Sequence, residues 1–357
     1  MVGDSIINKK FILTRTIPFA IIGLIAFILY LLFFVNVNDI IVTLGQTNWL
    51  FCLLATAATV LEMVFFALTW QFFLKPLSAN VPFKKIFTYT WLSNFVDLII
   101  PAESVSGEIS RVVCVMKDGV NTGKAAASVV SQRILGICIV AASLVIGAFL
   151  MLQMQIPLPQ MVQSMIYLII SVTALLLFLT MLIFTKEKWA HSAAGKIIGC
   201  AGWISRGRLK TDELKSKAGR AVAVFYDSLR TFRANPSRFI PPLAFAIVAW
   251  FFAILVYYLA FAAFGYNIDW VIVIVGYSIM VGIKSIPLGI PAEIGITEIA
   301  MTAIFGALGV PLGVSAAAVV LIRIITVWFR LGIGFITFQF VGVRTLVEIE
   351  KMFFNKK

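Results

Sequence analysis

Charged residues are scarce in this chain. Lysine, arginine, aspartate and glutamate together make up 13% of its 357 residues, whereas hydrophobic residues make up 61%. A soluble globular domain usually carries about 25% charged residues, so the composition excludes that class. Several apolar runs exceed the length of about 20 residues that a helix needs to cross a bilayer. We therefore expect an all-α polytopic membrane protein in which residues 1–357 form a single membrane domain.

Metal-binding residues are also few. The one histidine, His191, stands apart from any cluster of cysteines or carboxylates, and the four cysteines lack the spacing of a metal site. We interpret Cys52, Cys114, Cys138 and Cys200 as small apolar residues. The sequence therefore predicts no metal and no cofactor, and it gives no indication of nucleic-acid binding.

Six apolar runs are long enough to span the bilayer. The first is too long for the core of a signal peptide and is not followed by a cleavage site of small residues, so it is expected to remain as a span. The six predicted spans are residues 17–35, 49–74, 124–152, 160–184, 239–264 and 312–342.

Two further apolar segments are interrupted by proline. Residues 86–100 stop at Pro101, and a helical pattern restarts over 105–117. Each piece is about 20 Å long at 1.5 Å per residue, whereas the hydrocarbon core is about 30 Å thick. Residues 270–290 and 294–309 form a similar pair around Pro291. We expect two re-entrant pairs of half-helices, since irregular backbone at this depth needs surrounding protein or water.

The two re-entrant pairs belong to an internal repeat with an offset of 190 residues. Fourteen of 36 aligned positions are identical without a gap. The block 49–152 and the block 239–342 both contain a span, a re-entrant pair and a second span. The identical positions in the first block are Pro101, Ala102, Glu103, Glu108, Ile109, Gly119, Val120, Gly123, Ala126, Ala127, Val129, Val130, Arg133 and Ile134.

Basic residues indicate the orientation. Of 29 lysines and arginines, 24 fall in loops or termini on one predicted side of the membrane, which the positive-inside rule assigns to the cytoplasm. We therefore expect the protein to lie in the cell membrane with both termini on the cytoplasmic side. The two blocks then start on opposite sides of the membrane and form an inverted-topology repeat of the kind found in many transporters. The loop 186–238 has 12 basic and four acidic residues, and its apolar periodicity predicts an amphipathic helix on the membrane surface or a solvated linker helix.

Ionisable residues inside these apolar segments are the candidate site. Such groups are costly in a membrane and are usually functional, although they can also pair to lock the two repeats together. Half-helix N-termini at 104–107 and 294–297 offer N–H groups to an anion, and a lipid phosphate is the natural anion at this depth. We expect nine residues to bind the substrate, namely Glu103, Glu108, Arg111, Arg133, Lys284, Glu293, Glu298, Arg323 and Arg330. Seven others are expected to support them: Glu62, Asn94, Asp97, Pro101, Gly107, Pro291 and Gly295.

The repeat makes specific predictions about geometry. Residues 94–108 and 284–298 should face each other around a polar cavity near the midplane. Arg133 and Arg323 occupy equivalent positions and each follows a run of alanines that permits close helix approach. We expect these guanidinium groups to point towards the carboxylates of the re-entrant pairs, chiefly Glu108 and Glu298, and to share a lipid phosphate.

The whole chain resembles the transmembrane-domain family of lysylphosphatidylglycerol synthase, a flippase-like family. The resemblance depends on several motifs, which are Pro101…Gly107-Glu108…Arg111, Ala126–Arg133, Phe225…Leu229…Pro236, and Pro291…Gly295…Glu298 followed by Gly309-Val-Pro-Leu and Arg323. The second proline motif of the family usually reads Pro-Gly-Gly, where this chain has Pro291-Ala-Glu293. A glutamate often precedes the arginine of the first repeat, where this chain has Gln132.

The resemblance implies translocation of a phospholipid or a polyprenol-phosphate-linked lipid, with the head group bound between the re-entrant pairs. The alternative is a membrane-embedded lipid-modifying enzyme, with Glu103, Glu108 or Glu298 as acid or base, or an accessory subunit of a lipid-linked glycosylation or aminoacylation system. The sequence has no recognisable nucleophile–base pair or nucleotide loop, which favours the transporter. The expected partners are a membrane lipid with a phosphate head group and the bilayer, and a homo-oligomer remains open.

Overall fold

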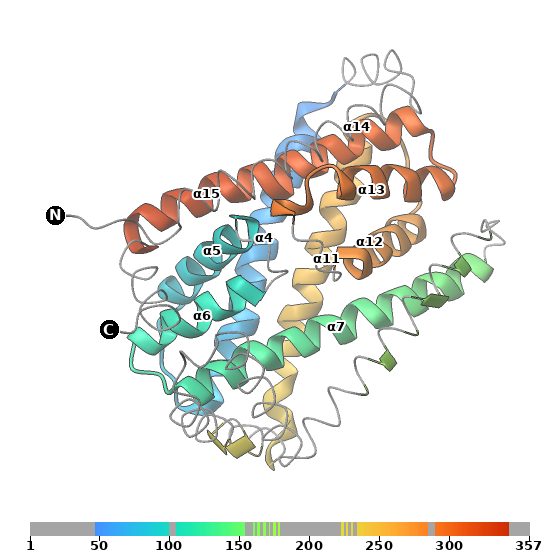
Figure 1. Cartoon of the computed structure of the whole chain (residues 1–357). Coiled ribbons are helices and arrows are strands. Elements are labelled where there is room, and N and C mark those ends of the chain that lie inside the picture. The colour runs from blue at the N-terminus through green and yellow to red at the C-terminus, as the bar shows by residue number, and fades with distance from the viewer. Residues whose placement is uncertain are drawn as a thin grey trace, which may run out of the picture.

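The computed structural model describes residues 47–99, 105–153, 235–284 and 290–342, with scattered positions within 160–178 and 223–234. Within these residues all regular structure is helical (Figure 1). Four helical stretches are long and apolar enough to cross a membrane: Trp49–Leu77, Thr122–Met151, Pro236–Ala262 and Leu312–Phe340. The all-helical membrane class is thus confirmed, and four predicted spans coincide with helices of spanning length. The predicted span 17–35 and most of 160–184 lie outside the described residues.

The described helices fall into two halves with the same order of elements. The first half contains α4 (Trp49–Leu74), α5 (Phe83–Ile99), α6 (Val105–Lys117) and α7 (Thr122–Gln153). The second half contains α11 (Ile240–Ala262), α12 (Trp270–Lys284), α13 (Ile296–Ala307), α14 (Leu312–Arg323) and α15 (Arg330–Thr337). A π-helical segment, Ile324–Phe329, joins α14 to α15, and a second one, Phe338–Gly342, follows α15.

Local sequence determines several of these helix ends. The side chain of Asn48 accepts a hydrogen bond from the Leu50 amide at 3.0 Å, which caps the N-terminus of α4. Gly119 ends the turn between α6 and α7 with φ of 83°, and Gly309 does the same between α13 and α14 with φ of 91°. Glycine adopts this left-handed conformation without a steric penalty, so the two turns use the same residue for the same reason.

The interrupted segments form short helices. α5 has 17 residues and α12 has 15, which corresponds to lengths of about 26 and 23 Å and falls short of the hydrocarbon thickness. α5 begins at Phe83 rather than 86. α12 accounts for Trp270–Lys284 of the predicted segment 270–290, and residues 285–289 lie outside the described residues. The predicted amphipathic helix within 186–238 lies almost entirely outside the described residues.

The two halves pack on each other reciprocally. α4 and α11 lie side by side through the middle of the molecule, and they form the most extensive helix contact among the described residues (Figure 1). α7 of the first half packs on α12 of the second, and α15 of the second half packs on α5 of the first. Buried alanines on α4 and α11, including Ala55, Ala58, Ala253 and Ala260, permit the close approach of these helices.

Glycine permits one of the reciprocal contacts. A Cβ atom added to Gly334 of α15 would lie 2.6 Å from the Cβ of Phe95 and 3.2 Å from the carbonyl oxygen of Trp91 on α5. Both distances are closer than ordinary van der Waals contact, so a side chain here would push α15 away from α5. The position of α5 beside α15 matters because α5 carries polar side chains into the region between the two halves.

Candidate functional site

A polar cavity of about 280 Å³ lies between the two halves. It is enclosed by apolar helices, yet three cationic side chains and three carboxylates line it. Asn94, Asp97 and Leu98 of the predicted segment 94–108 share this cavity with Lys284, Ile290, Ala292 and Glu293 of the segment 284–298. The lining residues are Glu62, Asn94, Asp97, Leu98, Ala253, Tyr257, Tyr277, Val281, Lys284, Ile290, Ala292, Glu293, Arg323, Thr326, Val327 and Arg330.

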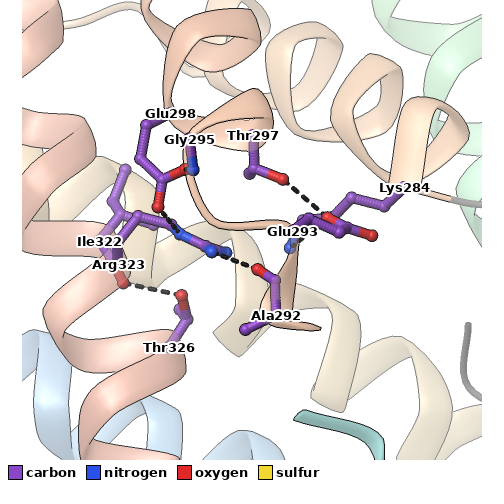
Figure 2. Close-up of polar contacts among 9 residues, drawn as sticks. All are labelled: Lys284, Ala292, Glu293, Gly295, Thr297, Glu298, Ile322, Arg323 and Thr326. Atoms are coloured by element: carbon purple, nitrogen blue, oxygen red, sulfur yellow. Dashed lines mark hydrogen bonds and ion pairs between the residues drawn. The ribbon is translucent and has the colours of Figure 1, made fainter. Parts of the chain in front are cut away.

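Arg323 is held tightly at one wall of this cavity. Its Nε donates to Oε1 of Glu298 at 2.6 Å, and an Nη group donates to the carbonyl oxygen of Ala292 (Figure 2). The second oxygen of Glu298 accepts a hydrogen bond from the Gly295 amide at 2.6 Å. Only 4% of Arg323 and 7% of Glu298 are exposed, so the ion pair is enclosed by protein on nearly all sides. The predicted pairing of these two residues is confirmed.

The loop before α13 has an unusual backbone. Ala292 and Glu293 have φ values of 49° and 52°, and Gly295 has φ of 90°. The left-handed region favours glycine, and each residue with a Cβ there is strained. Alanine and glutamate therefore adopt this turn at an energetic cost that glycine at the same positions would avoid.

Lys284 and Glu293 form the loosest ion pair of the cavity. Nζ of Lys284 lies 3.9 Å from Oε2 of Glu293, beyond hydrogen-bond distance. The same oxygen accepts a hydrogen bond from Oγ1 of Thr297 at 2.7 Å (Figure 2). Lys284 stands at the C-terminal end of α12, where the helix dipole favours a positive charge.

A further ion pair connects the two halves. Arg330 of α15 donates through Nη2 to Oε2 of Glu62 on α4. The Nε of Arg330 is buried and has no hydrogen-bond partner among the described residues. A buried unpaired donor is costly, so this side of the cavity is incompletely satisfied.

Asp97 is the cavity carboxylate without an ion-pair partner in the described residues. Its Oδ1 accepts hydrogen bonds from Oγ of Ser106 and from the amide of Gly107, both at 2.7 Å. A Cβ atom added to Gly107 would lie 2.3 Å from Oδ2 of Asp97, so only glycine lets α6 approach α5 this closely. Asp97 therefore holds the N-terminal turn of α6 against α5.

The first half has its own ion pair away from the cavity. Nη1 of Arg133 on α7 lies 2.6 Å from Oε1 of Glu108 on α6, as predicted. The spacing of 25 residues equals that between Glu298 and Arg323. This pair is more open, because 36% of the Arg133 side chain is exposed, compared with 5% for Arg323.

Arg111 is buried beside this pair. Its Nη1 donates to Oε1 of Gln132 at 2.6 Å, and its guanidinium lies over the rings of Phe66 and Trp70. The amide nitrogen of Gln132 donates in turn to the carbonyl oxygen of Phe66 at 2.8 Å. Neutral and aromatic groups thus hold the cation of Arg111 in place.

Comparison with known proteins assigns the chain to a family. The family described as "Lysylphosphatidylglycerol synthase TM region" matches residues 19–334. The chain belongs to this family. The resemblance stated from the sequence motifs is thereby confirmed over most of the chain.

Relatives of similar length are named as membrane proteins. A UPF0104 membrane protein of Pyrococcus horikoshii is 25% identical over 322 residues, which cover 88% of this chain and 93% of the relative. A UPF0104 membrane protein of Methanocaldococcus jannaschii is 25% identical over 319 residues, covering 87% and 90%. A third, from Methanothermobacter thermautotrophicus, is 22% identical over 328 residues, covering 90% and 94%. A membrane location for this chain follows from the family and the apolar helices.

The structure divides the predicted site residues into two groups. Lys284, Glu293, Arg323 and Arg330 line the cavity with three of the supporting residues, Glu62, Asn94 and Asp97. Glu298 contacts the cavity indirectly, through Arg323. Glu108, Arg111 and Arg133 form the cluster in the first half and are not among the lining residues. Gly107 lies in the first turn of α6, and Pro291 and Gly295 belong to the segment that precedes α13. Glu103 and Pro101 lie outside the described residues.

One sequence-based expectation is contradicted at one amide of each half-helix. We expected the amides at the N-termini of α6 and α13 to be available to an anion. The amide of Gly107 instead donates to Asp97, and the amide of Gly295 donates to Glu298. A carboxylate of the protein thus accepts the hydrogen bond of each of these amides. α5 supplies Asp97 for the first, and α13 supplies Glu298, three residues after Gly295, for the second.

Three polar residues of the cavity lining were not predicted. Tyr257 on α11 and Tyr277 on α12 line the cavity, and their rings meet edge to face with centroids 5.3 Å apart. Thr326 lines it from the π-helical segment. The sequence signal was weak, since tyrosine and threonine are common in apolar helices. For Thr326 the available clue was its position between Arg323 and Arg330 in the chain.

The described residues also limit the chemistry. They contain no group of three or more histidine, cysteine, aspartate or glutamate side chains that could hold a metal ion. The cavity offers cations, carboxylates and phenols, and this set binds charged ligands by hydrogen bonds and ion pairs.

Proposed function

We propose that this protein moves a lipid with a phosphate head group across the membrane, with the head group bound in the cavity between the two halves. One observation carries the proposal: a cavity of about 280 Å³ among apolar helices is lined by Lys284, Arg323 and Arg330. Positive groups at this depth are costly and mark substrate pathways in membrane proteins. Arginine and lysine are the residues that recognise phosphate.

The arrangement of the helices supports a transport mechanism. The blocks 49–152 and 239–342 would form an inverted-topology repeat, with α5–α6 and α12–α13 as the re-entrant pairs. The equal order of helices, the paired turns at Gly119 and Gly309 and the reciprocal packing of α7 on α12 and α15 on α5 all fit this repeat. In transporters of this kind the substrate site lies at the repeat interface. The cavity has that position relative to the two halves.

The orientation is part of the proposal. Lysine and arginine residues concentrate in the termini, the 75–85 loop, the 117–124 turn and the 186–238 loop, so these segments would be cytoplasmic. The basic loop would favour anionic lipid surfaces by about 1 kcal/mol per well-placed basic residue. A protease site inserted in that loop should be cut only from the cytoplasmic side of the cell membrane.

The test is lipid movement in liposomes that contain the purified protein. Phosphatidylglycerol with a fluorescent head group or chain should become accessible to an impermeant quencher faster than in protein-free liposomes, and it should be recovered chemically unchanged. Arg323→Gln should reduce this rate strongly, whereas Arg230→Gln, at an exposed position outside the cavity, should not. A new lipid product in place of movement would favour the alternative, a membrane-embedded enzyme.

A further inference from the structure

The three cations of the cavity differ in how firmly the protein already neutralises them. Arg323 is bonded to Glu298 at 2.6 Å and to a backbone carbonyl, and Arg330 is bonded to Glu62. Among the described residues, the carboxylate nearest to Lys284 is that of Glu293, at 3.9 Å. Direct hydrogen bonds between nitrogen and oxygen measure about 2.7–3.2 Å. Because the Lys284–Glu293 contact is longer than this, an incoming anion would replace a carboxylate at Lys284 more easily than at either arginine.

Glu293 is placed to give up this contact. Its carboxylate oxygen retains a hydrogen bond from Thr297 at 2.7 Å when Lys284 moves away. Its backbone stands in the left-handed region at φ of 52°, as does that of Ala292 at 49°. Strain of this kind persists where the surrounding structure imposes it and is concentrated at ligand clamps and switches. Arg323 donates a hydrogen bond to the carbonyl oxygen of Ala292 within this turn.

Lys284 is suited to the exchange. About a third of its side chain is exposed, and it lines the cavity opposite the α5 side chains Asn94 and Asp97. A lysine ammonium is a compact charge on a flexible stem, so it can turn from one anion to another without a fixed geometry. The two arginines keep their carboxylates and shape the site around it.

We propose that a phosphate anion binds in the cavity by displacing the Glu293 carboxylate from Lys284. Glu293 then acts as an exchangeable internal counter-ion of Lys284. The inference rests on the function proposed above, and the ligand chemistry is a phosphate group. A phosphodiester of a lipid head group and free inorganic phosphate both carry that chemistry, and the experiment separates them.

The experiment is a binding titration of the purified full-length chain in an uncharged detergent. Dihexanoylphosphatidylglycerol is one ligand and inorganic phosphate is the other. Glu293→Gln should tighten binding about tenfold, because the competing charge beside Lys284 is gone, and Lys284→Gln should weaken it about tenfold. In the Lys284→Gln background, Glu293→Gln should change the affinity less than about twofold, as expected when two residues act on one event.

Lys85→Gln is the matched control. Lys85 also pairs with a carboxylate, that of Asp118, but it is 52% exposed and does not line the cavity, so its substitution should leave the affinity unchanged. If Lys284→Gln fails to fold, Lys284→Arg serves instead: it should keep the affinity within about threefold, because the charge at this position is retained. A larger loss would contradict a role that depends on charge.

Several outcomes separate this inference from the proposed function. If Glu293→Gln tightens binding equally with and without Lys284, Glu293 repels anions generally, and the proposed exchange at Lys284 is overturned. Lipid movement by the wild type would still support the proposed transport function in that case. Tightening for the lipid alone supports both. Tightening for inorganic phosphate alone supports the exchange and contradicts a lipid substrate. If the wild type neither binds nor moves the lipid and does not bind phosphate, both are overturned.

Discussion

Arg330 on α15 donates to Glu62 on α4, a contact between side chains 268 positions apart in the chain. The other ion pairs around the short helices α6, α12 and α13 each lie within one half, and they are Glu108–Arg133, Glu298–Arg323 and Lys284–Glu293. Among the described residues, Glu62–Arg330 is thus the ion pair that ties the two halves together. The hypothesis that buried charges pair to lock the two repeats together therefore fits the Glu62–Arg330 pair, and it does not fit the three pairs that lie within one half.

Removal of one partner of this contact should destabilise the protein. Arg330→Gln would leave Glu62 in the cavity without its counter-ion, and breaking a buried ion pair typically costs about 3–5 kcal/mol. Thermal unfolding of the purified protein measures the loss. The double variant Glu62→Gln with Arg330→Gln should recover most of it, and a double variant as unstable as the sum of the single variants would contradict the pairing.

The two equivalent arginines should respond unequally. Arg323→Gln should lower thermal stability more than Arg133→Gln, because the Arg323 pair is enclosed by protein and the Arg133 pair is partly open. The expected losses are about 3–5 kcal/mol for Arg323 and less for Arg133. Equal losses would show that exposure in the structure does not govern the strength of these pairs.

Arg133 also allows stability to be separated from transport. Glu108→Gln combined with Arg133→Gln should restore folding, because neither partner is left as an unpaired charge. If the positive charge binds phosphate, this double variant should remain unable to move lipid. Thermal stability and lipid movement measured on the single and double variants distinguish a structural role of Arg133 from a role in phosphate binding. Full activity of Arg133→Gln alone would exclude a transport role for this residue.

Gly107→Ala should disturb the contact of α6 with α5. The new methyl group would lie 2.3 Å from the carboxylate of Asp97, and overpacking of this kind costs about 1–3 kcal/mol. Gly136→Ala in α7 is the control, because nothing lies within 4 Å of its added Cβ, and alanine favours a helix. Thermal unfolding should show a loss for the first and no loss for the second.

Ala292→Gly should stabilise the protein. Its φ of 49° is strained for alanine and free for glycine, so we expect a gain of about 1 kcal/mol in thermal unfolding. Ala300→Gly in α13 should have the opposite sign, because glycine weakens a helix interior. A destabilised Ala292→Gly variant would mean that the turn relies on the methyl group for packing.

The cavity should admit water. In a background without the native cysteines, Asn94→Cys and Thr326→Cys should react with a small charged thiol reagent in liposomes, because both positions line the polar cavity. Leu61→Cys is the control: Leu61 lies on an outer face of α4, is 41% exposed, and should be covered by lipid. Complete protection of both cavity positions in every condition would contradict a water-filled site.

The sequence predicted the pairs Glu108–Arg133 and Glu298–Arg323 because the repeat fixed the same spacing twice and a buried charge requires a partner. It also predicted the break before α13, since proline cannot continue a helix without losing a hydrogen bond. The corresponding Pro101 before α6 lies outside the described residues. These features depend on residues close in the chain or on the repeat itself.

Other features depend on how distant helices meet. The partner of Arg330 could not be predicted, because α4 and α15 become neighbours only when the halves pack. Tyr257 and Tyr277 join the site for the same reason. The capture of the Gly107 amide by Asp97 depends on the small separation of α5 and α6, which sequence patterns do not report.

The π-helical segment Ile324–Phe329 separates the two cavity arginines by a wider turn than an α-helix has. In a continuous α-helix, residues seven apart share one face, so Arg323 and Arg330 would project in nearly the same direction. The wider turn lets one arginine bond within its own half while the other reaches across to α4. Removal of one residue from this segment would rotate Arg330 by roughly 100° relative to Arg323 and withdraw it from Glu62. The winding of a single helical turn thus determines whether an ion pair forms between the two halves of the protein.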